Sequence, residues 1–329
     1  MKKWRVLWCV ILCVVVLSGT GVDLASAGSK ADIRYGAQYY PGEFVLKGYP
    51  QLWEKYGLTA EHILFSSGGE NNQALISGRA DVNCGSDSKT VGLFNVLGDK
   101  ALIIGTIQKG DRYSTVVRVN SKYKTWYDLK GKTVGTRLGT GAEQVLRRYF
   151  DKKGDLSWKD FNWVNLKLED MIAALQGGAI EAFTVWEPTP AIAEAQGIGR
   201  ILRTYGDISL VPVSLHTTVK YANEHRSEIV KFLAVHLDKA ELIKKDPNRA
   251  AELAAKAAGE KGYNVSADAF KRVFKRINFS IEINDNIIEA IENTGQFLYS
   301  KKKIKKIPTL KYDKSFLEEA KRLQQSTNQ

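Results

Sequence analysis

Lys132-Thr133-Val134-Gly135-Thr136-Arg137-Leu138-Gly139-Thr140-Gly141-Ala142-Glu143 is the stretch that decides the fold, because it predicts a strand, a glycine-rich turn and a helix start. Gly139 and Gly141 allow the tight turn, since glycine adopts positive φ without a Cβ clash. Thr140 is the predicted N-cap, and Glu143, three residues later, completes a capping-box pattern. A helix N-terminus carries unpaired amides and a partial positive charge. The stretch is therefore either an ordinary strand–helix turn or an anion site.

The N-terminus predicts a cleaved secretory signal peptide over residues 1–27. A basic start at residues 2–5 precedes the apolar run 8–17 and the small-residue pattern Ala25-Ser26-Ala27. The apolar run is well short of the ~20 residues that span a bilayer. Thr20 stands where a lipoprotein would carry its lipidated cysteine. We therefore expect an exported chain that is not lipidated.

Cysteine content and charge limit the remaining possibilities. Cys84 is the single cysteine after residue 27, so we expect no internal disulfide. The net charge is +12, and residues 300–329 hold nine Lys or Arg against three Asp or Glu. We interpret this basic run as a solvated surface. No nucleic-acid partner is expected, since an exported chain meets none routinely.

Strand and helix patterns alternate from residue 33 to residue 202, and only helical patterns follow residue 221. This alternation predicts an α/β fold with mainly parallel sheets covered by helices. Residues 44–56 predict one amphipathic helix that ends at Gly57. Short strands near residues 116–119 and 211–214 bracket the second block of alternation. We therefore expect an inserted second lobe joined to the first by two hinge strands.

Four consecutive parts of the chain resemble one known family. They are SGGENNQALISGRADV (67–82) with GSDS (85–88), DLKGKTVG (128–135), AALQGGAIEA (173–182) and VWEP (185–188). They resemble the periplasmic substrate-binding proteins of ABC importers, in the group for aliphatic sulfonates, taurine, nitrate and thiamine precursors. The resemblance runs from about residue 31 to residue 205, and the helical C-terminal third adds no matching motif.

The resemblance implies a type II periplasmic-binding fold, with two lobes, each holding a mainly parallel sheet, and a two-strand hinge. We expect residues 28–115 and 216–329 to form lobe I, and residues 116–215 to form lobe II with the hinge strands. Ligands of such sheets bind beyond the carboxyl ends of strands. Carried over by position, the family's contacts fall on Gln38, Ser67, Gly68, Ser86, Asp87, Thr136, Thr140, Gly141 and Trp186. We add Tyr39, Gly69 and Glu187 to this predicted ligand-binding set.

Some of these residues also have purely structural interpretations. Residues 67–69 either bind an anion through their amides or cap a helix. For Asp87 we favour an N-cap over a partner for a ligand ammonium. Trp186 is expected to face the cleft, where it would stack on a ring or line an alkyl chain. Glu187 either orients a ligand amine or lies at the hinge.

Further side chains near the predicted cleft receive simpler interpretations. Tyr39 and Tyr40 alternate along the strand end, so we expect only one of them to face the ligand. Arg137 is interpreted as a solvent-facing side chain. His216 is expected to be a core histidine with satisfied hydrogen bonds.

The sequence contains no catalytic or metal-binding pattern. G-x-S-x-G, Walker and H-E-x-x-H motifs are absent, and one cysteine with four scattered histidines suggests no metal site. We therefore expect a monomeric periplasmic receptor, not an enzyme, without a cofactor. It would capture a small organic anion of sulfonate, taurine or nitrate type for an ABC permease and its ATPase subunit in the inner membrane. The alternatives are a pyrimidine- or thiamine-precursor-like heterocycle as ligand, and a ligand-sensing receptor module.

Overall fold

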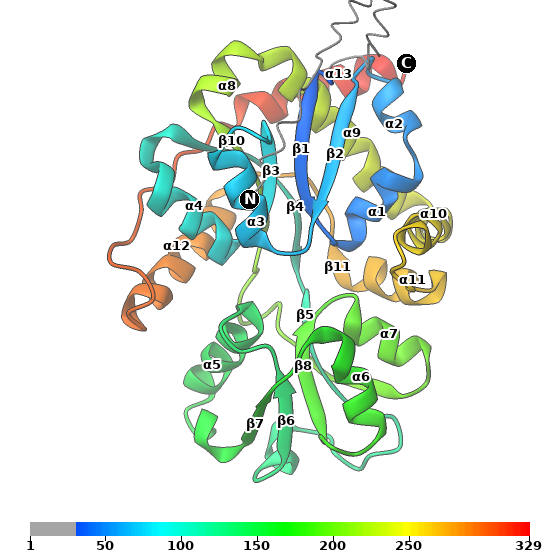
Figure 1. Ribbon diagram of the computed structural model, residues 1–329, viewed down its shortest axis with the longest axis vertical. Coiled ribbons are helices and arrows are strands. Elements are labelled where there is room, and N and C mark those ends of the chain that lie inside the picture. Colours follow the sequence, from blue (N-terminus) through cyan, green and yellow to red (C-terminus); the bar gives the residue numbers. More distant parts are fainter. Residues whose placement is uncertain (1–30) are drawn as a thin grey trace, which may run out of the picture. The chain divides into compact units, whose positions relative to one another are not determined.

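A computed structural model describes residues 31–329, whose strands form two sheets (Figure 1). The predicted signal peptide, residues 1–27, lies outside the described residues. The first sheet has the order β11-β4-β10-β3-β1-β2 and the second has the order β7-β6-β8-β5-β9. We call the parts built on these sheets lobe I and lobe II. Within residues 31–329, no helix combines the length and the apolar character needed to cross a membrane.

The strands of both sheets follow the βα alternation that the sequence predicts. The first sheet contains β1 (Ile33–Gln38), β2 (Ala60–Phe65), β3 (Val82–Ser86), β4 (Ala101–Gly110), β10 (Val213–Thr218) and β11 (Ile277–Asn278). The second sheet contains β5 (Tyr113–Arg118), β6 (Thr133–Thr136), β7 (Asn162–Asn165), β8 (Ala182–Trp186) and β9 (Gly199–Thr204). Strands β1, β2 and β3 pair in parallel, as do β6, β7 and β8. The prediction of mainly parallel sheets is confirmed.

One interior strand of each sheet runs antiparallel to both of its neighbours, and the edge strand β11 is also antiparallel to β4. Strand β10 is antiparallel to β3 and β4, and β5 is antiparallel to β8 and β9. Each of these strands has just arrived from the other sheet. A strand that leaves the carboxyl edge of one sheet and enters at the carboxyl edge of the other must run in the reverse direction.

Helices cover the sheets and supply most of the C-terminal third (Figure 1). They are α1 (Pro41–Gly48), α2 (Gln51–Glu54), α3 (Gly68–Ile76), α4 (Asp87–Leu97), α5 (Gly141–Lys153), α6 (Leu168–Gln176), α7 (Thr189–Ala195), α8 (Val219–Glu224), α9 (Arg226–Lys245), α10 (Pro247–Glu260), α11 (Ala267–Arg276), α12 (Asp285–Ser300) and α13 (Ser315–Thr327). Short 3-10 turns lie at Gly98–Lys100, Trp126–Leu129 and Trp158–Asp160.

The single helix predicted over residues 44–56 is wrong, because the chain forms α1 and α2 instead. Gly48 ends α1, and Pro50 precedes the first residue of α2. Proline has no amide hydrogen and its ring clashes with the preceding turn, so one helix cannot continue through this point. The apolar spacing of residues 44–56 hid this interruption.

The chain passes between the two sheets twice. Strand β4 continues through Asp111 and Arg112 into β5, and residues 205–212 lead from β9 back to β10. The predicted hinge strands near residues 116–119 and 211–214 overlap β5 and β10, respectively. The lobe boundaries at residues 116 and 215 stay a prediction, and the strand memberships put the crossings a few residues earlier in each case.

The two crossing segments are bonded to each other. The Gly110 amide donates to the Leu210 carbonyl at 2.7 Å, and the Gly206 amide donates to Asp111 Oδ1 at 2.6 Å. Val211 has a φ of 38°, a left-handed conformation that is unfavourable for a β-branched residue. The neighbouring backbone bonds therefore hold a strained position between the lobes.

An aromatic core anchors the second crossing segment inside lobe II. Trp126 is buried against Phe161 and Phe150, with ring centroids 4.9 and 5.1 Å apart. Its indole nitrogen donates to the Tyr205 hydroxyl at 2.9 Å. Burial of each such ring contributes about 1.5–3 kcal/mol. Tyr205, the first residue of the crossing segment, is thereby fixed to lobe II.

Candidate functional site

The predicted ligand-binding residues lie at or just after the carboxyl ends of five strands. Gln38, Phe65 and Ser86 end β1, β2 and β3, while Thr136 and Trp186 end β6 and β8. Ligands of open α/β sheets bind outside these strand ends. The loops therefore stand where a cleft between the two sheets would be lined.

A cavity of about 440 Å³ is lined from both lobes. Lobe I contributes Gln38, Tyr39, Tyr40, Ser66, Lys261, Gly262 and Tyr263, and lobe II contributes Leu168, Glu169, Ile172, Trp186, Thr189 and Ile192. This volume is within the range of small-molecule sites. Of the predicted ligand-binding residues, Gln38, Tyr39 and Trp186 line this cavity. We call it the two-lobe pocket.

Four aromatic side chains line the two-lobe pocket: Tyr39, Tyr40, Trp186 and Tyr263. The rings of Tyr39 and Tyr263 lie 5.9 Å apart, and Trp186 faces the same space from the end of β8. Both Tyr39 and Tyr40 line the pocket, and the expectation that only one of them faces the ligand stays a prediction. Tyr40 lies beyond the strand, at the N-cap of α1, where strand alternation no longer holds. Tyr263 belongs to the helical third, where no sequence motif indicated it.

Arg112 is a buried cation that contacts Tyr40, one of the residues lining the two-lobe pocket, without lining that pocket itself. Its side chain is 2% exposed, and its guanidinium carbon lies 5.4 Å from the ring centroid of Tyr40 and 5.6 Å from that of Tyr113. Nη1 donates to the Val211 carbonyl at 2.5 Å, while Nε has no hydrogen-bond partner among the described residues. Within residues 31–329 no carboxylate forms an ion pair with Arg112. Sequence reasoning missed this residue.

Tyr113 connects Arg112 to the N-terminus of α5. It is buried and pairs with Trp186 across strands β5 and β8, with ring centroids 6.3 Å apart. Its hydroxyl lies only 2.2 Å from where a Cβ on Gly141 would stand. Burial raises the pKa of Tyr113 to about 12, with the Arg112 cation acting against this shift. Gly141 is therefore glycine because the Tyr113 ring occupies the space of a side chain.

The predicted N-cap of α5 is confirmed, with a shifted capping box. Thr140 Oγ1 accepts from the Ala142 amide at 3.3 Å and donates to the Arg137 carbonyl at 2.6 Å. In a capping box Glu143 would accept a hydrogen bond from the amide of the N-cap, Thr140. It accepts instead from the amide of the preceding residue, Gly139, at 2.7 Å. The Thr140 side chain is thus occupied in holding the turn.

Thr136 is fully buried and donates to the Thr184 carbonyl of β8 at 2.9 Å. Its hydroxyl joins β6 to β8 instead of pointing into the two-lobe pocket. This bond uses the hydroxyl proton, so the side chain could donate a hydrogen bond to an anionic ligand only by giving it up.

Ser67, Gly68 and Gly69 form the N-terminus of α3. The Ser67 hydroxyl accepts from the Glu70 amide at 3.3 Å, so the capping interpretation is confirmed. A Cβ on Gly68 would lie 2.8 Å from Lys89 Cγ and 2.9 Å from Gln38 Oε1, so a larger residue would require these side chains to move. Anion binding by these amides stays a prediction.

Asp87 is buried and already bonded. The preferred interpretation of Asp87 as the N-cap of α4 is wrong, because Ser86 is the N-cap and Asp87 is the first helical residue. Its Oδ1 accepts from the Ser88 amide at 2.8 Å and its Oδ2 from the Thr294 hydroxyl at 2.6 Å. The carboxylate therefore ties α4 to α12.

Glu187 is bound by Arg276 at the contact between α11 and lobe II. Its Oε1 accepts from Arg276, and its Oε2 accepts from the Ala191 amide at 3.1 Å. Arg276 also pairs with Glu194 of α7. Burial raises the pKa of Glu187 to about 6, while the Arg276 cation opposes this shift. These partners hold Glu187 between α11 and lobe II, and its two predicted roles, orienting a ligand amine or lying at the hinge, stay predictions.

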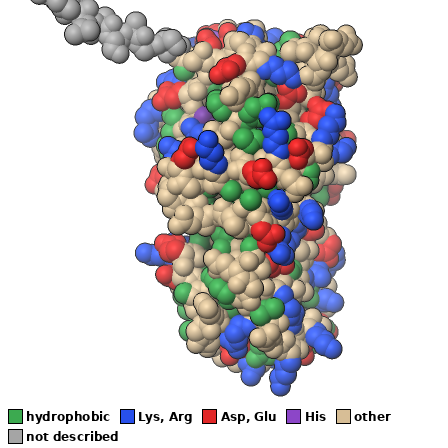
Figure 2. Space-filling view, turned by 90° about the vertical axis from the view of Figure 1, so that its right-hand side faces the viewer, with side chains coloured by type: hydrophobic (Ala, Val, Ile, Leu, Met, Phe, Trp, Pro, Cys, Tyr) green, Lys and Arg blue, Asp and Glu red, His purple; other side chains and the backbone are tan. Residues whose placement is uncertain are grey.

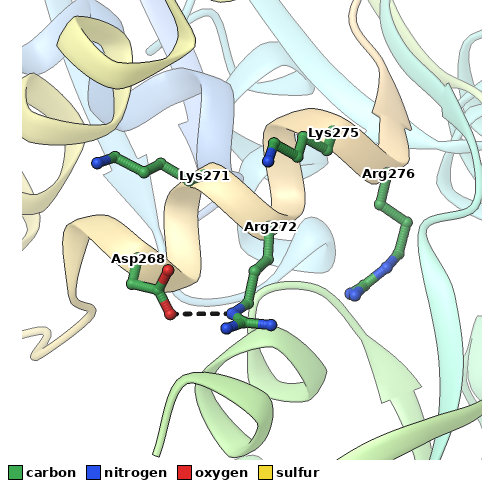
Figure 3. A pocket seen from close by; sticks show the side chains of 5 residues that line it. All are labelled: Asp268, Lys271, Arg272, Lys275 and Arg276. Atoms are coloured by element: carbon green, nitrogen blue, oxygen red, sulfur yellow. Dashed lines mark hydrogen bonds and ion pairs between the residues drawn. The ribbon is translucent and has the colours of Figure 1, made fainter.

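A second hollow runs along α11 and is lined by that helix alone (Figure 3). Arg272 pairs there with Asp268 at 2.9 Å, and Arg276 points away from Lys271. Acidic and basic side chains are interspersed on the side of the molecule where α7, α10 and α11 lie (Figure 2). The α11 hollow therefore lacks the two-sided lining of the two-lobe pocket.

His216 is a core histidine, as predicted. Its ring nitrogens lie 2.9 Å from Asn83 Oδ1 and 2.9 Å from Thr90 Oγ1, and the side chain is fully buried. Burial lowers its pKa to about 3. Residues 31–329 contain no group of three or more His, Cys, Asp or Glu side chains placed to hold a metal ion.

Known proteins resemble this chain in sequence and in fold. A Bacillus subtilis protein named as an aliphatic sulfonates-binding protein is 25% identical over 97% of both chains. The periplasmic aliphatic sulphonate binding protein SsuA from Escherichia coli superimposes with a TM-score of 0.73 at 22% identity, over 88% of this chain and 91% of SsuA. A mutant of the enzyme DszB, in complex with biphenyl-2-sulfinic acid, gives a TM-score of 0.66 at 14% identity, over 88% of this chain and 99% of DszB.

These structural neighbours share the two-sheet architecture, and they include both binding proteins and an enzyme. The family assignment rests on the sequence itself. The model of the NMT1-like family matches residues 30–258, which contain all twelve predicted ligand-binding residues and Arg112. The chain belongs to the NMT1-like family.

Proposed function

We propose that this protein is an exported receptor that captures a small organic anion of sulfonate type and delivers it to an ABC permease with its ATPase. Its B. subtilis relative and SsuA are both named as sulfonate-binding proteins, and SsuA is named as periplasmic. The observation that carries the proposal is Arg112, a buried cation without a carboxylate partner among the described residues.

A buried, unpaired cation favours an anionic ligand. Burying a charge without compensation is unfavourable by several kcal/mol, so an anion beside Arg112 would recover much of this energy. A guanidinium can also form two parallel hydrogen bonds to an oxyanion. The free Nε of Arg112 supplies one donor for such an arrangement.

The organic part of the ligand would occupy the two-lobe pocket. Tyr40 contacts Arg112 and also lines this pocket, so head group and organic part would lie on either side of it. Tyr39, Trp186 and Tyr263 offer aromatic faces for an alkyl chain or a ring. Micromolar binding requires about 8 kcal/mol, which one charged contact and a buried apolar group supply together.

Closure around the ligand would take place at the two crossing segments. Residues 110–112 and 205–212 are the links between the sheets, and hinges commonly consist of a few such residues. The closed receptor would dock as a monomer on its permease. Export by a cleaved signal peptide and the absence of lipidation are parts of the same proposal.

The receptor is proposed to lack enzymatic activity, although DszB shares its fold. Cys84 is the single cysteine after residue 27 and is fully buried in β3. Burial raises the pKa of its thiol to about 12, so the nucleophilic thiolate is not formed near neutral pH. A heterocyclic ligand is the second candidate, favoured by the four aromatic side chains of the pocket.

Thermal-shift measurements with matched ligands test the proposal. The panel consists of 1-propanesulfonate, benzenesulfonate, taurine, nitrate and an uncharged aminopyrimidine. The proposal expects sulfonates to raise the melting temperature and 1-propanol, which matches 1-propanesulfonate without its charge, to leave it unchanged. A shift with the aminopyrimidine alone would favour the heterocycle, and turnover of a bound compound would contradict a pure binding role.

A further inference from the structure

We propose that the loop between α12 and α13 binds the surface of an anionic lipid bilayer. Lys301, Lys302, Lys303, Lys305 and Lys306 lie within six residues of this loop, and all five are exposed. We call residues 301–307 the lysine loop. It lies beside lobe I on the left of Figure 1, where the orange chain leaves α12 next to α4. None of its residues lines the two-lobe pocket.

The charge of the lysine loop is not neutralised locally. Residues 293–312 contain six lysines and no aspartate or glutamate. Within residues 31–329, none of the loop's five ammonium groups forms an ion pair. Burial acts to raise the pKa of Glu143 in α5, but bonds from Gly139 and Arg147 lower it overall, and Lys303 adds a smaller lowering effect. The loop therefore presents a concentrated positive charge to solvent.

Helix α12 ends with Lys302 in a backbone conformation that usually requires glycine. The Lys303 amide donates to the Leu298 carbonyl and the Lys302 amide to the Tyr299 carbonyl, each at 2.9 Å. These two bonds form a Schellman motif. In this motif the residue after the C-cap, here Lys302, adopts a left-handed conformation that favours glycine. Lys302 has a φ of 56°. The chain thus carries a charged side chain where local geometry prefers none.

The loop is anchored, so its lysines are presented from a defined surface. Ile304 and Leu310 pack against a buried cluster that includes Val91, Phe94 and Ile291. Ile307 packs beside Gly295 of α12, with its Cγ2 atom 3.3 Å from where a Cβ on Gly295 would stand. This contact holds the end of the loop against α12. Contacts on both sides of residues 305–306 therefore fix the loop to lobe I.

Exposed apolar side chains beside the lysines favour a bilayer over a soluble polyanion. Tyr299 is 52% exposed and Ile307 is 45% exposed, on the two sides of the lysines in sequence. Tyrosine and aliphatic side chains enter the headgroup region of membranes, while lysines attract anionic headgroups. A soluble polyanion would use the charges but not the apolar groups.

The expected strength is that of a reversible surface attachment. Each lysine near an anionic membrane surface contributes about fivefold in partitioning at physiological salt. Salt screens this attraction, so binding falls as ionic strength rises. A receptor without a lipid anchor would in this way be concentrated at the membrane that holds its proposed permease.

Cosedimentation with lipid vesicles tests the proposal. We use the chain without residues 1–27, because the apolar run 8–17 would itself bind lipid, and residues 31–329 form a compact unit of their own. The vesicles are pure phosphatidylcholine or a mixture with phosphatidylglycerol. Binding is expected only with the anionic vesicles, and it should fall steeply with added salt.

Two triple variants of equal charge change make the test specific. K302Q/K305Q/K306Q should lose about a hundredfold in partitioning to the anionic vesicles. K271Q/R272Q/K275Q removes the same amount of charge from α11 (Figure 3). Its partitioning to the anionic vesicles should stay within about twofold of the wild-type value. Equal losses in both variants, or equal binding to both vesicle types, would overturn the proposal. Circular dichroism checks that both variants are folded.

One further variant separates the bilayer from other polyanions. Y299S keeps every charge and should lower vesicle binding several-fold while leaving the binding of soluble polyphosphate unchanged. Polyphosphate binding tighter than vesicle binding, with no effect of Y299S on either, would instead assign the loop to a soluble polyanion. The thermal shift caused by 1-propanesulfonate should be the same in K302Q/K305Q/K306Q, so failure here leaves the proposed receptor function standing.

Discussion

Gly141 is the residue of the opening stretch with the least freedom to change. The Tyr113 hydroxyl lies 2.2 Å from the position that a Cβ would take if a larger residue replaced Gly141. Gly141→Ala should lower the free energy of unfolding by about 1–3 kcal/mol, the usual effect of overpacking. Chemical denaturation measures this difference.

Gly69→Ala is the matched control, because the nearest atom to its Cβ would be Ser67 Oγ at 3.8 Å. Gly69 is helical, so alanine should raise the stability there by up to about 1 kcal/mol. Equal effects of the two substitutions would show that Tyr113 does not crowd Gly141.

His216 should make the stability of the protein depend on pH. Its folded-state pKa of about 3 lies below the ordinary value of 6.5, because burial disfavours the charged ring. The stability it contributes is complete above pH 6.5 and is lost as the pH falls toward 3. Between pH 7 and pH 5, His216→Gln should therefore lose about 2 kcal/mol less stability than the wild type.

Urea denaturation at both pH values measures the His216 effect. His225→Gln is the control, since His225 is partly exposed at the start of α9. His62 and His236 are buried with lowered pKa values, mainly because of desolvation, and they add acid sensitivity in both variants. An unchanged pH dependence in His216→Gln would contradict the assignment.

At the level of elements, the contact of α11 with lobe II depends on Arg276. Arg276→Gln leaves Glu187 buried without its cation and should lower the stability at pH 7 by about 3 kcal/mol. Because the folded-state pKa of Glu187 is raised, its contribution is complete at low pH and is lost as the pH rises through about 6. The deficit of Arg276→Gln should therefore shrink at pH 5.

Thermal or urea denaturation at pH 5 and pH 7 checks this prediction. Arg272→Gln removes the exposed pair with Asp268 on the same helix and should change stability by less than about 1 kcal/mol. A deficit of Arg276→Gln that does not depend on pH would mean that Glu187 stays charged throughout.

The elements themselves were largely predictable from local sequence. Helix N-caps at Ser67 and Thr140 were readable because hydroxyl side chains bond to nearby amides, which is a local property. The break between α1 and α2 was also local, at Pro50, but the apolar spacing concealed it. The roles of Asp87 and Glu187 were not predictable, because their partners, Thr294 and Arg276, lie far away in the chain.

At the level of the whole molecule, the pocket could be predicted only in part. Gln38, Tyr39 and Trp186 were accessible through family resemblance and strand ends. Arg112 was not, because it becomes a buried cation only when the fold brings Tyr40 next to the first crossing segment. Tyr263 reaches the pocket from a helical region in which no spacing pattern indicates a binding residue.

Ligand binding should protect the crossing segments from hydrogen exchange. The amides of Gly110 and Gly206 bond to the opposite crossing segment, and the proposed hinge motion would open these bonds. At ligand concentrations a hundred times the dissociation constant, their exchange should slow by about a hundredfold. Fraying amides at the end of α13 should not change, and equal slowing there would argue against a hinge at these segments.

The central claim is that Arg112 recognises the anionic group of the ligand, and calorimetric titration with 1-propanesulfonate tests it most directly. We expect wild-type protein and Arg272→Gln to bind equally, with a dissociation constant in about the micromolar range. Arg112→Gln, verified as folded by circular dichroism, should bind at least about tenfold more weakly. Undiminished binding by Arg112→Gln, or no binding of any sulfonate by the wild type, would contradict the account.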